Sequence, residues 1–357
     1  MNEASEKLRL LRAVLEAEGL DAVVLQRPGN VAWLSGGGRT HVVAVQETGV
    51  AAVVVTADAV EVVVAVNEAA RLEAEELGSL GATFRIVGWD ADLDAELPRG
   101  DRVGSDVAAE GRRDVAAALE AARRPLTAPE RERYRALGRD AAAALTAAAL
   151  AVAPDDSEQR AAALAAAGLL ERGIDPIVLL VAGEQRLPEH RHPLPTAAPL
   201  GRLAMIVVCG RRGGLIASLT RFVSFGPLRP ELQERYERLL RVDAAFNLAT
   251  RAEQATVGDV FAAGTRAYRK NGFDADEWRL HHQGGPTGYE PRDYLATAES
   301  RPVVREHQAF AWNPSVPSLK CEDTILATDE LPEVLTVDPE WPTTVVDGLA
   351  RPLILER

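Results

Sequence analysis

Two prolines, Pro125 and Pro129, lie between helix-forming stretches and divide this chain into two parts. Proline interrupts a helix because it has no backbone N–H, so residues 123–130 are predicted to form a linker. The chain has 357 residues, which is more than one hydrophobic core usually supports and enough for two domains. We therefore predict one domain over residues 1–124 and a second over residues 125–357.

The first part has the pattern of an α/β domain. Apolar residues at helical spacing predict a helix that ends before Gly19, and a second helix is expected from about Arg112 to Ala122. Residues 30–40, which contain three consecutive glycines, are predicted to be a loop. Strands are predicted at three short apolar runs, Ala22–Leu25, Val50–Thr56 and Val62–Val66.

The second part is longer and mixes helices with strands, so we expect an α+β domain there. Helices are predicted over Glu130–Val152, Ser157–Arg172, Glu231–Glu253 and Val257–Asn271. Strands are predicted over Ile177–Ala182, Leu203–Val208, Leu215–Phe222, Gln308–Asn313, Glu322–Thr328 and Glu333–Val337. The overall fold class is α+β, with an α/β domain first.

Charge and composition exclude several classes of protein. The formal net charge of −13 and the scattered basic residues argue against a nucleic-acid-binding protein. No apolar run approaches the roughly 18 residues that a membrane span needs. Two cysteines are too few for a disulfide framework, and the polar N-terminus lacks the features of a secretion signal. A cytoplasmic location is expected.

Polar residues that suit a binding site are concentrated between His281 and Asp293. This segment combines glycines, which let the backbone approach a ligand, with histidine, tyrosine, arginine and carboxylate side chains. A surface turn with incidental polar residues is the alternative. The chain has no HExxH, CxxC or GxSxG pattern, so spacing alone predicts neither a metal site nor a serine nucleophile. Cys209 and Cys321 adjoin apolar runs and are expected to be buried, inert thiols.

The order of several short motifs resembles the creatinase/prolidase/aminopeptidase P family, whose C-terminal domain has the pita-bread fold. The opening GLDAVVLQRPGNVAWLSG resembles the start of that family's N-terminal domain. The motifs that carry the resemblance in the second domain are RHPLPT, SLTRF, HHQGGPTGYEPRD, FAWNP and KCEDTILAT. The resemblance implies a creatinase-like N-terminal domain followed by a pita-bread domain.

The resemblance also implies where metal ligands would lie. Metallopeptidases of this family hold two divalent ions with two Asp, one His and two Glu, and these positions correspond here to Val207 (or Val208), Ser218, Gly285, Asn313 and Glu322. Only Glu322 keeps a ligand type of that set. Two adjacent cations need several anionic oxygens to offset their repulsion. We therefore expect no dinuclear metal centre and no cofactor.

The outer polar residues of the family site persist, and the resemblance implies roles for them. His192 and His281 are candidate acid/base groups, because histidine can both accept and donate a proton near neutral pH. Glu322 is the third candidate catalytic residue. Residues expected to contact the substrate are His282, Tyr289, Arg292, Asn313 and Arg39. Relatives of this size are usually homodimers, in which Arg39 would reach the partner's pocket.

Three functions remain open. The first is a metal-independent hydrolase or lyase that acts on a C–N bond of a small amino-acid-like molecule, with His192 as acid/base. The second is a non-catalytic protein that binds a peptide or protein partner. The third is a metal-dependent Xaa-Pro aminopeptidase or dipeptidase, which would require a different assignment of the ligands. A small molecule or short peptide is the expected ligand in the first case.

Overall fold

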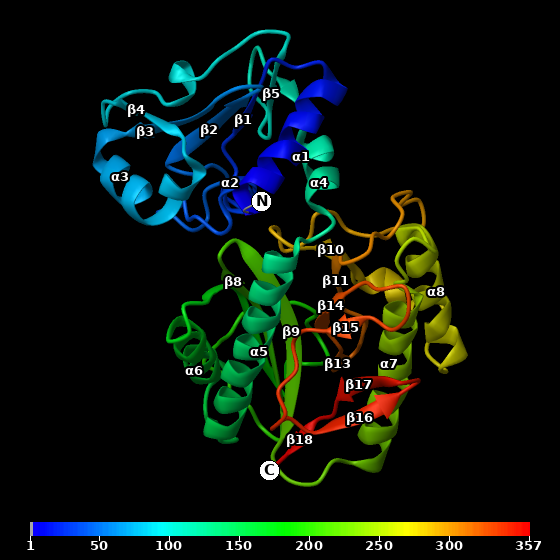
Figure 1. Ribbon diagram of the computed structural model, residues 1–357. Helices are drawn as coiled ribbons and strands as arrows, with labels where there is room; N and C mark the ends of the chain where they lie inside the picture. The colour runs from blue at the N-terminus through cyan, green and yellow to red at the C-terminus, as the bar shows by residue number, and fades with distance from the viewer. Residues whose placement is uncertain (1–2) are drawn as a thin grey trace. The chain divides into compact units, whose positions relative to one another are not determined.

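The computed structural model describes residues 3–357, and these form two compact units (Figure 1). The first unit contains the residues up to Glu130 together with Gly213–Leu215. The second unit contains Arg131–Arg212 and Ile216–Arg357. Within residues 3–357, no helix is long and apolar enough to cross a membrane.

The first unit is built on a six-stranded mixed sheet with the order β4-β3-β2-β1-β5-β6. Its strands are β1 (Ala22–Leu25), β2 (Ala51–Thr56), β3 (Val60–Ala65), β4 (Thr83–Val87), β5 (Val103–Ser105) and β6 (Arg113–Asp114). The β1/β2 and β2/β3 pairs are antiparallel, whereas β1/β5 and β3/β4 are parallel. The central strands are rich in valine and fully buried, as the three apolar runs in the sequence predict.

The helices of the first unit are α1 (Glu3–Glu18), α2 (Pro28–Ser35), α3 (Val66–Arg71) and α4 (Ala116–Arg123), with a π-helical turn at Leu72–Leu77 and 3-10 turns at Gly78–Leu80 and Asp94–Glu96. The prediction of a loop over residues 30–40 is wrong in its first half, because α2 occupies it. Proline at the first helical turn favours a helix start there, and Gly36 ends the helix in a left-handed conformation (φ 79°). The predicted helix from Arg112 begins four residues later, since Arg113–Asp114 pairs with β5.

The second unit has four long helices, α5 (Ala128–Ala151), α6 (Glu158–Leu170), α7 (Pro230–Ala249) and α8 (Val257–Lys270), and a 3-10 turn at Glu277–Leu280. They match the four helices predicted from the sequence to within a few residues. Thr256 and Asp259 form a capping box at the start of α8, which satisfies two backbone N–H groups. Helices α7 and α8 lie side by side (Figure 1).

The second unit contains two four-stranded sheets. One has the order β18-β9-β8-β7 and the other β10-β11-β14-β15, and β12/β13 and β16/β17 form separate hairpins. The strands are β7 (Asp175–Gly183), β8 (Leu203–Arg212), β9 (Leu215–Ser224), β10 (Gly284–Thr287), β11 (Ala309–Trp312), β12 (Ser315–Val316), β13 (Leu319–Lys320), β14 (Asp323–Leu326), β15 (Glu333–Val334), β16 (Thr343–Val346), β17 (Leu349–Pro352) and β18 (Leu355–Glu356). The sheets are joined where the backbone N–H of Thr220 in β9 donates to the carbonyl of Glu322 (3.0 Å).

Aromatic side chains fill the core between α7, α8 and the second sheet. Phe246 of α7 stacks on Trp312 of β11 with ring centroids 5.1 Å apart, and both side chains are fully buried. Gly264 of α8 faces this pair so closely that a Cβ placed there would lie 2.2 Å from Phe246 Cδ1. The close approach of α8 to α7 therefore depends on a residue without a side chain at position 264.

We predict that Gly264→Ala destabilises the second unit although alanine favours helix. The added methyl group must displace a stacked aromatic ring, and such overpacking costs about 1–3 kcal/mol. The matched control is Gly168→Ala in α6, where a Cβ would meet Ala144 at an ordinary 3.5 Å, and alanine there is expected to stabilise by roughly 0.5–1 kcal/mol. Urea unfolding of both variants checks this. Equal effects of the two substitutions would contradict the packing argument.

Candidate active site

The second unit has a half-open cavity of about 670 Å³. Residues of β7 together with Leu194 and Leu295 form an apolar wall. The histidine, arginine, lysine, asparagine and glutamate side chains that line the cavity form its polar end. The residues that line the cavity are Ile177, Val178, Leu179, Leu180, His192, Leu194, Val207, Cys209, His282, Pro291, Arg292, Leu295, Asn313, Lys320 and Glu322. A cavity of this size suits a small molecule or a short peptide.

Glu322, immediately before β14, is the only carboxylate among the residues that line this cavity. Its Oε2 lies 2.7 Å from Lys320 Nζ and 3.0 Å from Thr220 Oγ1, and its Oε1 lies 2.8 Å from Arg292 Nη2. Burial on its own raises the pKa of Glu322, but Lys320 and Arg292 outweigh burial and lower it to about 2. Glu322 is therefore ionised at neutral pH and is fully engaged by two protein cations.

Three histidines form a cluster at the polar end. His192 lies on the loop between β7 and β8, and His281 and His282 lie just before β10. The Nε2 atoms of His192 and His281 are 2.9 Å apart, and His281 Nδ1 lies 3.2 Å from Ser315 Oγ. The ring of His282 packs against both neighbours, with centroids 4.5 Å and 5.4 Å away.

The cluster is neutral at physiological pH. Burial, and next the positive charge of Lys320, lower the pKa of His281 to about 2. Burial, and next Arg292, lower the pKa of His282 to about 4. The pKa of His192 is lowered in the same way, by desolvation and then by Lys320. Each neutral imidazole therefore carries one N–H and one nitrogen lone pair, and one of the two facing Nε2 atoms of His192 and His281 donates to the lone pair of the other.

Three buried polar atoms at the cavity have no hydrogen-bond partner within residues 3–357. They are Arg292 Nε, Asn313 Oδ1 and His282 Nδ1. The other groups of the Arg292 guanidinium are engaged, since its Nη atoms contact Glu322 Oε1 and the carbonyl of Pro291. A donor on Arg292 and an acceptor on Asn313 are thus unpaired at the same cavity, which is unusual for buried groups.

The structure brings together most of the residues that the sequence singled out. His192, His281, His282, Arg292, Asn313 and Glu322 all lie at or beside the cavity. Tyr289 is buried and is not among the residues that line it. Arg39 belongs to the first unit, where its guanidinium pairs with Glu76 (2.8 Å). The predicted binding roles of Tyr289 and Arg39 stay predictions.

Lys320, Ser315 and the apolar wall formed by β7 were not predicted from the sequence. One signal for Lys320 was present, because it lies two residues before Glu322 in the sequence and carries the opposite charge. Ser315 follows the FAWNP motif and pairs with a histidine 34 residues earlier, so no local pattern could identify it. Cys209 is buried as expected, with its Sγ 3.2 Å from Ser218 Oγ, and burial raises its pKa.

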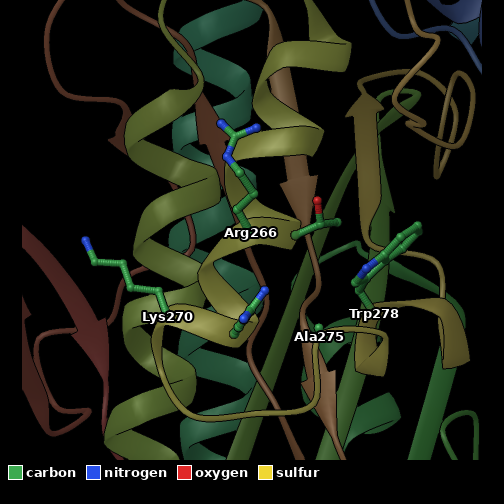
Figure 2. Close-up of a pocket in the computed structure, with 6 residues that line it drawn as sticks. Arg266, Lys270, Ala275 and Trp278 are labelled. Carbon is green, nitrogen blue, oxygen red and sulfur yellow. The ribbon is translucent and has the colours of Figure 1, made fainter.

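A second hollow of about 620 Å³ lies at the C-terminal end of α8 (Figure 2). It is lined by Thr265, Arg266, Arg269, Lys270, Ala275 and Trp278. The cations there are exposed and sit where positive charge balances the helix dipole. None of the candidate site residues lines this hollow, so the chemistry of the second unit is concentrated in the first cavity.

Comparison with known families agrees with this arrangement. Residues 7–124 match the creatinase/prolidase N-terminal domain. Residues 132–329, more than half of the chain, match metallopeptidase family M24. The chain belongs to metallopeptidase family M24. The two matches confirm the predicted resemblance and fold class, and the M24 match covers all the cavity residues.

Solved structures share the fold of this M24 chain over nearly its whole length. A prolidase from Pyrococcus horikoshii OT3 is 17% identical, with a TM-score of 0.78 over 93% of this chain and 98% of that one. A dipeptidase PepE from Mycobacterium ulcerans is 18% identical, with a TM-score of 0.77 over 99% and 98%. The N-terminal domain of the FACT complex subunit SPT16 from chickpea, 14% identical, has a TM-score of 0.68 over 94% and 96%. A search of curated proteins finds no match.

We predict that Glu322→Gln destabilises this chain strongly at pH 7. The substitution leaves the buried Lys320 and the partly buried Arg292 without their shared anion, and breaking a buried pair in this way costs about 3–5 kcal/mol. The folded-state pKa of Glu322, about 2, lies below the ordinary 4.5. Its stabilising contribution is therefore complete above pH 4.5 and is lost as the pH falls towards 2.

Urea unfolding of the wild type and the variant at several pH values tests this prediction. The difference in the free energy of unfolding between the two proteins should be constant from pH 7 to about 4.5. It should become smaller below that pH. Glu253→Gln is the control, because Glu253 pairs with Arg305 at the surface, and its loss is expected to cost less than about 1 kcal/mol. A small difference in the free energy of unfolding at pH 7 would show that burial of Lys320 and Arg292 does not require the charge of Glu322.

Proposed function

We propose that this M24 chain hydrolyses a C–N bond in a small amino-acid-like molecule or short peptide that carries a carboxylate, without a dinuclear metal centre. The observation that carries the proposal is the set of unpaired buried polar atoms at the cavity, above all Arg292 Nε and Asn313 Oδ1. A buried group that lacks a partner costs about 1–3 kcal/mol. A ligand that pairs with these atoms removes that cost.

Charge supports a carboxylate as the group that binds Arg292. Arg292 and Lys320 contribute two positive charges and Glu322 one negative charge, so the polar end has an excess of one positive charge while the histidines are neutral. An arginine N–H pairs well with a carboxylate oxygen. Asn313 Oδ1 is an acceptor, and it suits an amine or amide N–H of the same ligand. An amino acid or peptide supplies both groups.

The apolar wall supports a ligand with a hydrophobic side chain. Ile177, Leu179, Leu194 and Leu295 all line the cavity, and apolar surface removed from water contributes roughly 25 cal/mol per Å². This wall lies along the same cavity as the polar end. The ligand class that matches both is an apolar amino-acid derivative or a short peptide.

The residues at the positions that the resemblance gives to the metal ligands do not fit two divalent cations. Val207 has no donor atom, Ser218 Oγ contacts Cys209 Sγ, and Asn313 is uncharged. Gly285 has φ 150°, and a Cβ there would lie 2.8 Å from the carbonyl oxygen of Tyr294, so no histidine fits without a backbone shift. Glu322 is engaged by two protein cations. The proposed reaction therefore has no step that uses a metal pair.

His192 is the proposed proton carrier. It lines the cavity and is the most exposed of the three histidines. The Nε2 of His192 contacts His281 Nε2, and His281 Nδ1 contacts Ser315 Oγ. Together these contacts orient the His192 ring. In the proposed reaction, a water oxygen bonds to the carbonyl carbon as the C–N bond breaks. His192 takes the proton of that water and returns it to the leaving nitrogen.

Ligand binding tests the carboxylate assignment directly. We expect Xaa-Pro dipeptides and N-acyl amino acids to bind more tightly than their carboxamide counterparts in calorimetry. Arg292→Ala should weaken binding of the carboxylates at least about tenfold, because a charged hydrogen bond contributes roughly 1.5–3 kcal/mol. Arg266→Ala, in the hollow on α8, is the control and should have no effect. Equal affinities for carboxylate and carboxamide would contradict the assignment.

Turnover distinguishes an enzyme from a non-catalytic binding protein. We expect release of the amine product, followed by NMR, to continue in the presence of a chelator. His192→Ala should lower kcat about 10²–10⁴-fold, the range of general acid–base catalysis, while ligand affinity is retained. Activity that requires added divalent metal would refute the metal-independent mechanism. Tight binding without turnover would favour a binding protein instead.

A further inference from the structure

The arrangement of the three clustered histidines suits a second role besides proton transfer. One nitrogen from each of His192, His281 and His282 can be chosen so that all three atoms lie within 4.8 Å of one another. We propose that these histidines bind a single Zn²⁺ ion. None of them falls at a position that the family resemblance gives to a metal ligand, so the proposed site is distinct from a dinuclear centre.

The distances fit a tetrahedral ion after small side-chain movements. Zn–N bonds of about 2.0–2.1 Å in a tetrahedron place the ligand nitrogens roughly 3.3 Å apart. The observed Nε2–Nε2 separation of His192 and His281 is 2.9 Å, and the widest separation in the cluster is 4.8 Å. Side-chain movements that shorten the widest separation by about 1.5 Å complete the fit. Three imidazoles with one open position form a known type of zinc site.

The residues behind the histidines support coordination. A zinc-bound histidine commonly uses its second nitrogen to contact a polar group, which fixes the ring. His281 Nδ1 lies 3.2 Å from Ser315 Oγ, and Arg191 Nη1 donates to the same oxygen (3.0 Å). The Ser315 backbone N–H donates to Tyr268 (3.0 Å), so this partner is held in place. His282 Nδ1 is buried without a hydrogen-bond partner among residues 3–357.

The charges that face the cluster moderate its affinity for a cation. Lys320 and Arg292 lie close enough to act on the histidines, and Glu322 partly offsets them. The three side chains sum to one positive charge, which opposes a second cation nearby. Imidazole nitrogen is a good ligand for Zn²⁺ and a poor one for Mg²⁺ or Ca²⁺. The site should therefore select a transition metal.

Bound Zn²⁺ would act as a reversible inhibitor. The ion takes the Nε2 lone pair of His192, which then cannot accept a proton from water. This consequence rests on the proposed function, in which His192 carries the proton. Binding of the ion itself does not depend on turnover, so it is measured on the whole protein without any organic ligand.

Equilibrium dialysis and calorimetry with ZnCl₂ test the proposal, and Co²⁺ serves as a spectroscopic substitute. We expect one Zn²⁺ per chain and the visible absorption of tetrahedral Co²⁺. His192→Ala and His282→Ala should each weaken binding by more than about 100-fold, because loss of an outer partner alone costs 10–100-fold. Ser315→Ala should weaken binding about tenfold. His190→Ala, an exposed histidine outside the cluster, should change nothing.

Several results would overturn the proposal. They are Zn²⁺ binding that survives His282→Ala, binding that is lost equally in His190→Ala, or an octahedral Co²⁺ spectrum. Circular dichroism of each variant verifies that it is folded. A chain that binds Zn²⁺ but no carboxylate ligand supports this inference and refutes the proposed function. A chain that binds the carboxylate ligand but no Zn²⁺ supports the proposed function and refutes the zinc site.

Discussion

The buried carboxylate of Glu322 holds the polar end of the cavity together. It contacts Lys320 from the adjacent β13 and Arg292 from the loop after β10, so one anion connects two separate segments. Two buried cations without an anion would repel each other and remain desolvated, which is strongly unfavourable. The direction of the Arg292 side chain, and with it the position of its unpaired Nε, depends on this contact. The proposed ligand site is a consequence of that charge balance.

Much of the fold follows from local patterns. The valine-rich runs that form β1 and β2 are short, buried and bounded by turn residues. Helices α5 and α6 are rich in alanine, which favours helix, and α8 has a clear apolar face. Helix α2 was missed because three glycines suggested a loop, although Pro28 marks a helix start. The strands β16–β18 were also missed, since the β16 strand alternates between exposed and partly buried residues and prolines interrupt the segment.

The site was less predictable than the fold, for a physical reason. Motif order placed His192, Arg292 and Glu322 in one region, but it could not show that Glu322 is bound to two cations. The Arg292–Glu322 pair joins residues 30 positions apart in the sequence. It depends on the positions of the loop after β10 and of the residues just before β14. Unpaired atoms such as Asn313 Oδ1 are visible only once every neighbour is placed. Charge balance and hydrogen-bond satisfaction are properties of the assembled site.

A shared fold with prolidases and dipeptidases does not decide the chemistry of this site, because fold and function are separable. The central proposal is that this cavity functions with a balanced set of charged side chains and without a metal pair. The most direct test is the number of Mn²⁺ ions per chain, measured by mass spectrometry after equilibration and removal of free ion. Mn²⁺ prefers carboxylate oxygen ligands, so the account predicts none bound at this cavity. Two Mn²⁺ ions per chain would contradict it.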